Sequence, residues 1–159
     1  VILRPMIQSL PYVSMMSSVA VVRALKRIPV ASVSIKWPND VMINGKKVSG
    51  ILVENTIKGN ILEYCVVGIG INVDFDTSSY PLIDHTATSL NVECGRQIDR
   101  NQLAGYLLEE MDYLYTVCSD TANPLYEDHI NDNILNAWKE LLNTLGKDVK
   151  VKWNQYIYS

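Results

Sequence analysis

Two short motifs contain the residues of this 159-residue chain whose types and spacing could do chemistry. The first is Lys36-Trp37-Pro38-Asn39-Asp40, in which an amine, an amide and a carboxylate gather around a proline turn. The second is Gly68-Ile69-Gly70-Ile71-Asn72-Val73, a glycine-spaced segment in which backbone can approach a ligand closely. Together they predict a nucleotide site on the connections of a sheet.

The first motif offers charge and turn chemistry. Lys36 ends a predicted strand beside the stiff Trp37-Pro38 step, so its ammonium could face charge that develops on phosphate oxygens. A surface lysine that ends a strand is the alternative. Asn39 and Asp40 are candidates for ligand contact, although Pro-Asn-Asp is also ordinary turn chemistry in which Asx side chains bond their own backbone. We expect Trp37 to be a core anchor rather than a stacking platform.

Alternation along the second motif separates its side chains. Ile69 and Ile71 fall on one face, and Gly68, Gly70 and Asn72 fall on the other. A flat ring could lie on the glycine side, and an amide both donates and accepts, as an adenine edge requires. The motif is neither a dinucleotide fingerprint nor a P-loop, because the third glycine and the G-K-[ST] ending are absent.

The surrounding pattern predicts an α+β fold, with a mostly antiparallel mixed sheet covered by helices. Residue periodicity predicts a helix over 12–27 with capping serines Ser14, Ser17 and Ser18, and strands over 33–36, 41–43, 46–54 and 61–67 with a hairpin at Asn44-Gly45. Farther along the chain, a helix is predicted after the Asp99 and Gln102 capping pair, and Asn123-Pro124 opens another helical stretch. A third helix is predicted to end at Gly146, with an apolar face formed by Ile134, Trp138, Leu141 and Leu145.

Charge is unevenly distributed along the chain. Residues 1–60 carry eight Lys or Arg against two acidic residues, 8 − 2 = +6, and the remainder carries six against fifteen, 6 − 15 = −9, which sum to −3. A positive first third suits an anionic ligand such as a nucleotide, or it is a solvated basic surface. The basic residues are spread out without aromatic interleaving, which argues against a nucleic-acid footprint.

The residues that most often bind metals are scattered. Cys65, Cys94 and Cys118 show no C-x-x-C spacing and are expected to be buried or idle thiols. His85 and His129 lack an H-E-x-x-H pattern or a cysteine partner, which argues against zinc. Apolar stretches fall short of the ~20 residues that a membrane span needs, and no charged-then-apolar leader opens the sequence, so a soluble, cytoplasmic protein is expected.

Three motifs in order resemble the catalytic domain of biotin protein ligases. Between the two motifs above, Ser49-Gly50-Ile51-Leu52-Val53-Glu54 matches the G-I-L-V-E-like strand that in this family links K-W-P-N-D to G-I-G-I-N-V. The resemblance implies a fold like that of class II aminoacyl-tRNA synthetases and biotin synthetases. It also implies an enzyme that joins the biotin carboxylate to the α-phosphate of ATP with Mg²⁺, and then passes biotin to a lysine of a biotin carboxyl carrier domain.

The resemblance assigns roles residue by residue. Lys36 is implied to be catalytic, contacting the adenylate phosphate and the biotin carboxyl. Gly50, Ile51 and Leu52 are implied to bring strand backbone against the biotin ring. The nucleotide is implied to contact Asn39, Asp40, Gly68, Gly70 and Asn72.

The resemblance runs from about Leu3 to Trp153 and begins after the family's G-R-G-R-x-G-R loop. It divides the chain into a partial catalytic domain, 1–145, and the beginning of a small C-terminal SH3-like β-barrel, 146–159, whose strand over 149–153 is expected to lack a partner. The isolated chain is therefore expected to be inactive. DNA is a partner only if an upstream winged helix exists, and a homodimer is compatible with the family.

Two other functions stay open on the sequence. One is a noncatalytic ligase-like module that binds nucleotide or a partner domain. The other is a relative of lipoate or octanoyl transferases, which share the fold but generally lack the combination of K-W-P-N-D with G-I-G-I-N-V.

Overall fold

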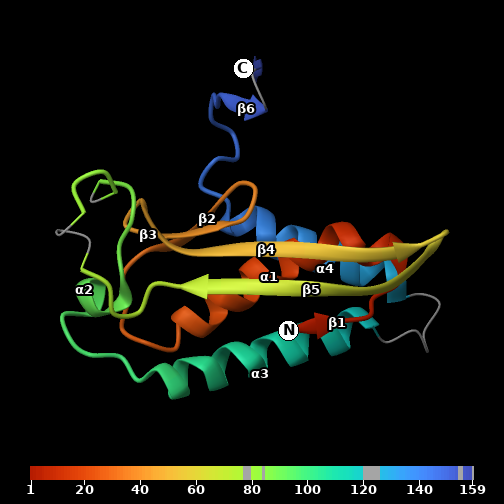
Figure 1. Cartoon of the computed structure of the whole chain (residues 1–159), viewed down its shortest axis with the longest axis horizontal. Coiled ribbons are helices and arrows are strands. Elements are labelled where there is room, and N and C mark those ends of the chain that lie inside the picture. Colours follow the sequence, from red (N-terminus) through yellow and green to blue (C-terminus); the bar gives the residue numbers. More distant parts are fainter. Residues whose placement is uncertain (77–79, 84, 120–125, 154–155, 159) are drawn as a thin grey trace.

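The computed structural model describes residues 1–76, 80–83, 85–119, 126–153 and 156–158. It has an antiparallel sheet with helices on one side and a short hairpin beyond them (Figure 1). The elements in chain order are β1 (Ile2–Leu3), η1 (Ile7–Ser9), α1 (Leu10–Leu25), β2 (Val33–Lys36), β3 (Asp40–Ile43), β4 (Lys46–Lys58), β5 (Ile61–Ile71), α2 (Leu90–Cys94), α3 (Arg100–Ser119), α4 (Tyr126–Leu141), β6 (Val151–Trp153) and β7 (Tyr156–Tyr158).

The sheet has five strands in the order β1-β5-β4-β3-β2, and neighbouring strands pair antiparallel throughout. Two isolated bridges, Ile35 with Leu142 and Lys47 with Ala87, are parallel. The predicted α+β class is confirmed. The sheet is more uniformly antiparallel than expected because β2, β3, β4 and β5 follow one another through tight turns, which only antiparallel strands allow, and because β1 also pairs antiparallel with β5.

The β3–β4 hairpin follows directly from the sequence. Asn44 and Gly45 both have positive φ, 49° and 79°. A two-residue turn of this kind matches the right-handed twist of the flanking strands, and Asn-Gly is the pair that adopts it most readily. The hairpin predicted at this position is confirmed.

Helix α1 lies behind the sheet, and α3 and α4 pack against it (Figure 1). Its residues from Met16 to Val22 are all buried. A helix that is apolar on nearly all sides must be covered on all sides, and here the sheet and two helices cover it. The core therefore lies on the helix side of the sheet.

The helix boundaries are partly as predicted. Asp99 caps α3, since its Oδ1 accepts hydrogen bonds from the backbone N–H groups of Asn101 (2.8 Å) and Gln102 (3.2 Å). The predicted caps of α1 are wrong. Ser17 and Ser18 donate back to the carbonyls of Val13 and Met15 within the helix, because both serines lie in its buried middle.

The C-terminal predictions need two corrections. A single helix, α4, takes the place of the two expected, and it ends at Leu141, so Leu145 lies beyond it and is exposed. The Leu142 backbone N–H donates to the Lys139 carbonyl, and the Asn143 backbone N–H donates to the Ile35 carbonyl of β2. These two hydrogen bonds turn the chain away from the helix axis toward β2. The predicted opening at Asn123-Pro124 lies outside the described residues. Strand β6 was expected to lack a partner, but it pairs with β7.

None of the described helices combines the length and apolar character needed to cross a membrane.

Candidate functional site

The three motifs meet at one level of the sheet. Lys36 of β2 pairs with Asp40 of β3, Asp40 pairs with Gly50 of β4, and Gly50 pairs with Gly70 of β5. Directly paired residues of antiparallel strands share a face. One row therefore carries an ammonium, a carboxylate and two glycines on the same side, and we call it the motif row.

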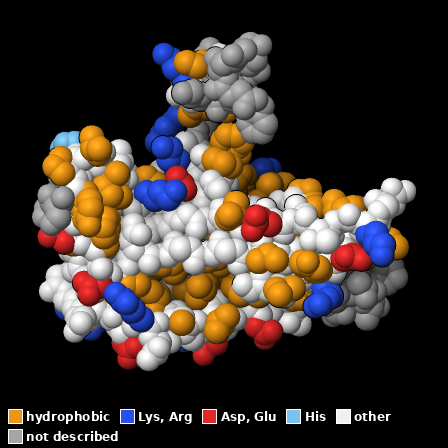
Figure 2. All heavy atoms as spheres, viewed as in Figure 1, with side chains coloured by type: hydrophobic (Ala, Val, Ile, Leu, Met, Phe, Trp, Pro, Cys, Tyr) orange, Lys and Arg blue, Asp and Glu red, His pale blue; other side chains and the backbone are white. Residues whose placement is uncertain are grey.

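The row lies on the face of the sheet that α1 does not cover. Ile51 and Ile69 pair on the helix side, whereas Leu52 and Gly68 pair on the open side, next to the row. Ile51 is 2% exposed and Leu52 is 61% exposed. Figure 2 shows a pale surface over the left part of β4 and β5 on the open face, whereas hydrophobic and charged side chains lie farther right along the same strands. We call the surface formed by Gly50, Gly68 and Gly70 the glycine floor.

The glycines of the floor are not required by their backbone conformation. Positive φ is found at Gly45, Gly59, Gly95 and Gly146, all outside the floor. A Cβ on Gly70 would come no nearer than 4.0 Å to any atom outside its chain neighbours. Neither backbone strain nor crowding requires glycine at position 70. The effect of the missing side chain is therefore open space above the sheet.

The second motif was predicted to be a loop, which is wrong in part. Gly68 to Ile71 belong to β5 and pair with Ser49 to Leu52 of β4. Glycine weakens a strand locally, but a long ladder with a well-formed neighbour overrides that preference. The alternation predicted for the motif, with isoleucines toward the core and glycines outward, is confirmed.

Lys47 is a site residue that sequence reasoning missed. Its Nζ lies 2.5 Å from Asp40 Oδ1, and a Cβ built on Gly50 would lie 3.1 Å from the same Nζ. The Lys47 ammonium therefore hangs over one end of the glycine floor. Nearly half of its side chain is exposed, so a ligand could displace the Asp40 carboxylate and take its place.

A β-bulge explains why the sequence pattern missed this lysine. Val41 pairs with Ser49 and Met42 pairs with Lys47, which leaves Val48 as the extra residue on β4. Strict alternation would place residues 47 and 50 on opposite faces, and the bulge brings them to the same face. The only local sign of this lysine in the sequence is the pair Lys46-Lys47 directly after the Asn44-Gly45 turn.

Asn39 and Asp40 are both engaged within the protein. Asn39 Nδ2 donates to the Ile51 carbonyl at 2.6 Å, and the Ile51 amide donates to the Asn39 carbonyl at 3.0 Å. The two bonds fix the turn of the first motif against β4. The backbone of Ile51 is thus occupied and its side chain is in the core, so of the three biotin residues implied by resemblance only Gly50 and Leu52 face the open side.

Asn72 closes the open end of β5. Its backbone N–H donates to the Val48 carbonyl at 2.8 Å, and its Nδ2 donates to the Thr88 carbonyl at 3.0 Å. The amide that was predicted to meet adenine therefore also anchors residues 86–88, which lead from the β5–α2 connection back to the sheet and which we call the return segment. Its Oδ1 remains the side-chain acceptor for a ligand.

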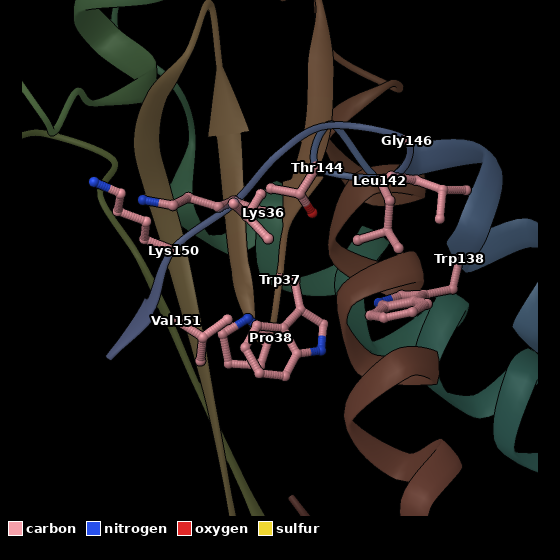
Figure 3. Close-up of a pocket in the computed structure, with 11 residues that line it drawn as sticks. Lys36, Trp37, Pro38, Trp138, Leu142, Thr144, Gly146, Lys150 and Val151 are labelled. Carbon is pink, nitrogen blue, oxygen red and sulfur yellow. The ribbon is translucent and has the colours of Figure 1, made fainter. Parts of the chain in front are cut away.

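The turn of the first motif borders a separate cavity of about 710 Å³ (Figure 3). Trp37 is half exposed there, so its predicted role as a core anchor is wrong; the turn projects it beyond the sheet. Trp138 lines this space, and its buried indole N–H has no partner among the described residues. The Lys36 and Lys150 side chains extend together, away from Trp138. Lys36 thus borders both the motif row and the cavity.

The cysteines match their prediction where they are described. Cys65 is fully buried and Cys94 is partly buried, and burial raises the pKa of both thiols. The side chains of Cys118 and His129 lie outside the described residues. Within the described part of the chain, no three His, Cys, Asp or Glu side chains gather in a group that could hold a metal ion.

The sheet that carries the motif row has counterparts in known ligases. Residues 4–72 match the biotin/lipoate A/B protein ligase family. The match covers 69 of the 159 residues and contains the whole motif row.

The chain is also similar to individual biotin ligases. Over 110 residues the chain is 38% identical to the bifunctional ligase/repressor BirA of Bacillus subtilis, which covers 67% of the chain and 34% of that protein. It is 35% identical over 109 residues to the biotin–[acetyl-CoA-carboxylase] ligase of Mycobacterium tuberculosis, covering 67% of the chain and 38% of that protein. The chain thus spans little more than a third of these relatives.

Among solved structures, a mutant of the Aquifex aeolicus biotin protein ligase in complex with biotin superimposes with a TM-score of 0.71. The sequence identity is 25%, and the match covers 93% of this chain and 57% of that one.

Proposed function

We propose that this chain carries the adenylate-forming floor of an ATP-dependent biotin–protein ligase. The reaction has two steps. A biotin carboxylate oxygen attacks the α-phosphorus of ATP and expels pyrophosphate, and the ε-amine of a lysine on a biotin carboxyl carrier domain then attacks the biotinyl carbonyl and expels AMP. The relatives named above support the assignment, and a cytoplasmic enzyme follows from it.

The observation that carries the proposal is the glycine floor. Gly50, Gly68 and Gly70 are unstrained strand residues on the uncovered face. The Lys47 ammonium lies over Gly50 and the Asn72 amide follows Gly70, so both are at the end of the floor where β4 begins and β5 ends. A flat apolar ring can approach such backbone closely, which suits the biotin ring system, and Leu52 offers apolar contact beside it. The cation and the amide then both face the same end of the ligand, where the phosphate and the adenine of the adenylate would lie.

In this proposal two lysines serve the adenylate. The transition state places extra negative charge on phosphate oxygens, and a preorganised cation stabilises this charge best where water is excluded. Lys36 keeps its predicted role from the β2 end of the motif row. Lys47 adds a second charge directly over Gly50, and exchanges the Asp40 carboxylate for the phosphate.

Mg²⁺ accompanies ATP in this proposal. The described residues offer no cluster of three metal ligands. Mg²⁺ is usually bound through substrate phosphates, water and one or two carboxylates, so Asp40 of the motif row would be its protein ligand once Lys47 has turned to the phosphate. The ion would neutralise charge on the phosphates.

The test is biotinyl-AMP formation by the longest product that the gene encodes, followed by liquid chromatography with radiolabelled ATP. We expect Lys36→Ala and Lys47→Ala each to slow this step by about 10²-fold or more, as loss of one preformed electrostatic contact commonly does. Lys58→Ala is the matched control, because Lys58 is an exposed lysine at the far end of the same β4 strand. A wild-type protein that forms no adenylate from biotin refutes the proposal, and wild-type speed in either site variant refutes that lysine's role.

Lipoate is the competing substrate, because the matched family includes lipoate ligases. Incubating the same protein with biotin, lipoate or octanoate and an acceptor domain distinguishes the three by the mass added to the acceptor. We expect only the biotinyl mass. A lipoyl or octanoyl mass instead would reassign the substrate while leaving the glycine floor in place. ATP binding without any transfer would indicate the noncatalytic module.

A further inference from the structure

One buried threonine joins the separate parts of the site. Thr88 is 1% exposed, and each of its polar groups has a partner. Its N–H donates to the Lys47 carbonyl at 2.9 Å, its carbonyl accepts from Asn72 Nδ2 at 3.0 Å, and its Oγ1 donates to Glu93 Oε1 at 2.7 Å. The residue thus contacts both strands, β4 through Lys47 and β5 through Asn72, at the end of the glycine floor where these two residues lie.

Glu93 of α2 fixes this threonine to the hairpin. Its second oxygen, Oε2, accepts from Asn44 Nδ2 at 2.7 Å. Asn44 sits in the β3–β4 turn, only three residues before Lys47. Hydrogen bonds to a carboxylate are shorter and stronger than neutral ones, and one carboxylate here bridges two elements far apart in the sequence.

A second pair of backbone bonds strengthens the connection. The Lys47 N–H donates to the Thr86 carbonyl at 2.8 Å, so Lys47 is held on both sides of its backbone by residues 86 and 88. The return segment behaves as a short extra strand along the start of β4. Its position depends on where α2 and Glu93 lie.

We propose that Thr88 and Glu93 form a latch that positions Lys47 relative to Asn72. Neither residue lies on the glycine floor, and both act through other residues. The latch sets the backbone from which the Lys47 ammonium extends and, through the Thr88 carbonyl, the orientation of the Asn72 amide. The consequence for catalysis rests on the proposed function, whereas the latch itself does not.

The test compares Thr88→Val with Thr88→Ser. Valine keeps the shape and both backbone bonds but removes the hydroxyl donor, and serine keeps the donor. In the unliganded chain, amide hydrogen exchange measured by NMR should be about tenfold faster at Lys47 and Thr88 in the valine variant and close to wild type in the serine variant. In adenylate formation, kcat should fall about tenfold in the valine variant with little change in the KM for biotin, because misplacement of a catalytic group weakens chemistry more than ground-state binding.

Glu93→Ala gives an independent check, because it removes the same bond from the other side. The double variant Thr88→Val/Glu93→Ala should be no slower than the Glu93→Ala single variant, since partners in one bond are not additive. Unchanged exchange at Lys47 and Thr88 overturns the latch. Faster exchange with an unchanged kcat overturns its role in positioning. If the wild-type protein proves to make no adenylate, the proposed function fails and the exchange result alone decides the latch.

Discussion

The two faces of β4 and β5 are built from alternating residues of the same strands, yet they follow different rules. On the helix face, Ile51, Val67 and Cys65 are buried against α1 and the rest of the core. On the open face, the glycine floor gives up all side-chain packing although its φ angles would accept any residue. Side chains on the helix face serve core packing, whereas the open face leaves room for a ligand. Substitutions on the helix face should therefore change the free energy of unfolding, and substitutions on the open face should change ligand affinity.

The largest effect on stability is expected on the helix face. Ile51→Ala should lower the free energy of unfolding by about 2–5 kcal/mol, because it leaves a cavity in a packed core. Leu52→Ala, one residue along, should change it by no more than about 0.5 kcal/mol, because that side chain is exposed. Urea unfolding measured by circular dichroism gives both values. Equal losses at the two positions would contradict the division between the faces.

A smaller effect is expected at Asn72, where the open face meets the return segment. Asn72→Ala removes the donor that satisfies the Thr88 carbonyl, at an expected cost of about 1–3 kcal/mol in unfolding free energy. Isothermal titration with each ligand separately should show ATP binding weakened more than biotin binding. Weakened biotin binding with unchanged ATP affinity would show that Asn72 does not serve the adenine.

Gly70→Ala should affect binding alone. The added methyl group would meet only the Gly50 carbonyl oxygen, at 4.0 Å and without a clash, so stability should stay within about 1 kcal/mol of wild type or rise slightly. Biotin affinity should fall about tenfold, or about 1.4 kcal/mol, as the ring is lifted off the floor.

Gly59→Ala is the matched control for this glycine. Gly59 has a φ of 60° in a turn away from the floor, so alanine there should lower stability by about 1–2 kcal/mol and leave biotin affinity unchanged. A Gly70→Ala protein that binds biotin normally would show that the floor does not seat the ring.

The smallest effect uses the cysteines as probes of the two environments. Because burial raises the pKa of the Cys65 and Cys94 thiols, less thiolate is present near neutral pH, and the onset of alkylation should shift to higher pH than for a free thiol. Partly exposed Cys94 should react in the folded state, and Cys65 on the helix face only after opening. Peptide mapping by mass spectrometry resolves the two sites. Equal labelling rates would show that the helix face is open to solvent.

Local signals made much of the fold predictable. The Asn44-Gly45 turn and the Asp99 cap depend on a few adjacent residues, and both were predicted correctly. The inward and outward alternation of the second motif was also predicted, because period 2 follows from strand geometry alone. The motif was still taken for a loop, since glycines argue against a strand until its partner is known.

The features that were missed depend on contacts between distant residues. The Lys47 ammonium reaches the open face through a bulge whose position is set by the register of β3 against β4. The end of α4 depends on β2, since Ile35 draws Asn143 away from the helix. Thr88 and Glu93 belong to no motif, and their importance appears only when the return segment lies beside β4.

The bulge at Val48 implies that the number of residues between a lysine and a glycine does not tell whether the two side chains share a face of the sheet until the strand pairing is known. Here three positions separate Lys47 from Gly50, and the extra residue places both on the open face. In a relative whose strand ran without a bulge, the same three positions would turn the lysine into the apolar layer, and a lysine two positions before the glycine would take over its place. A search for related sites should therefore accept a lysine either two or three positions before the glycine. The number of inward-facing residues between them, one without a bulge and two with it, then decides which case applies.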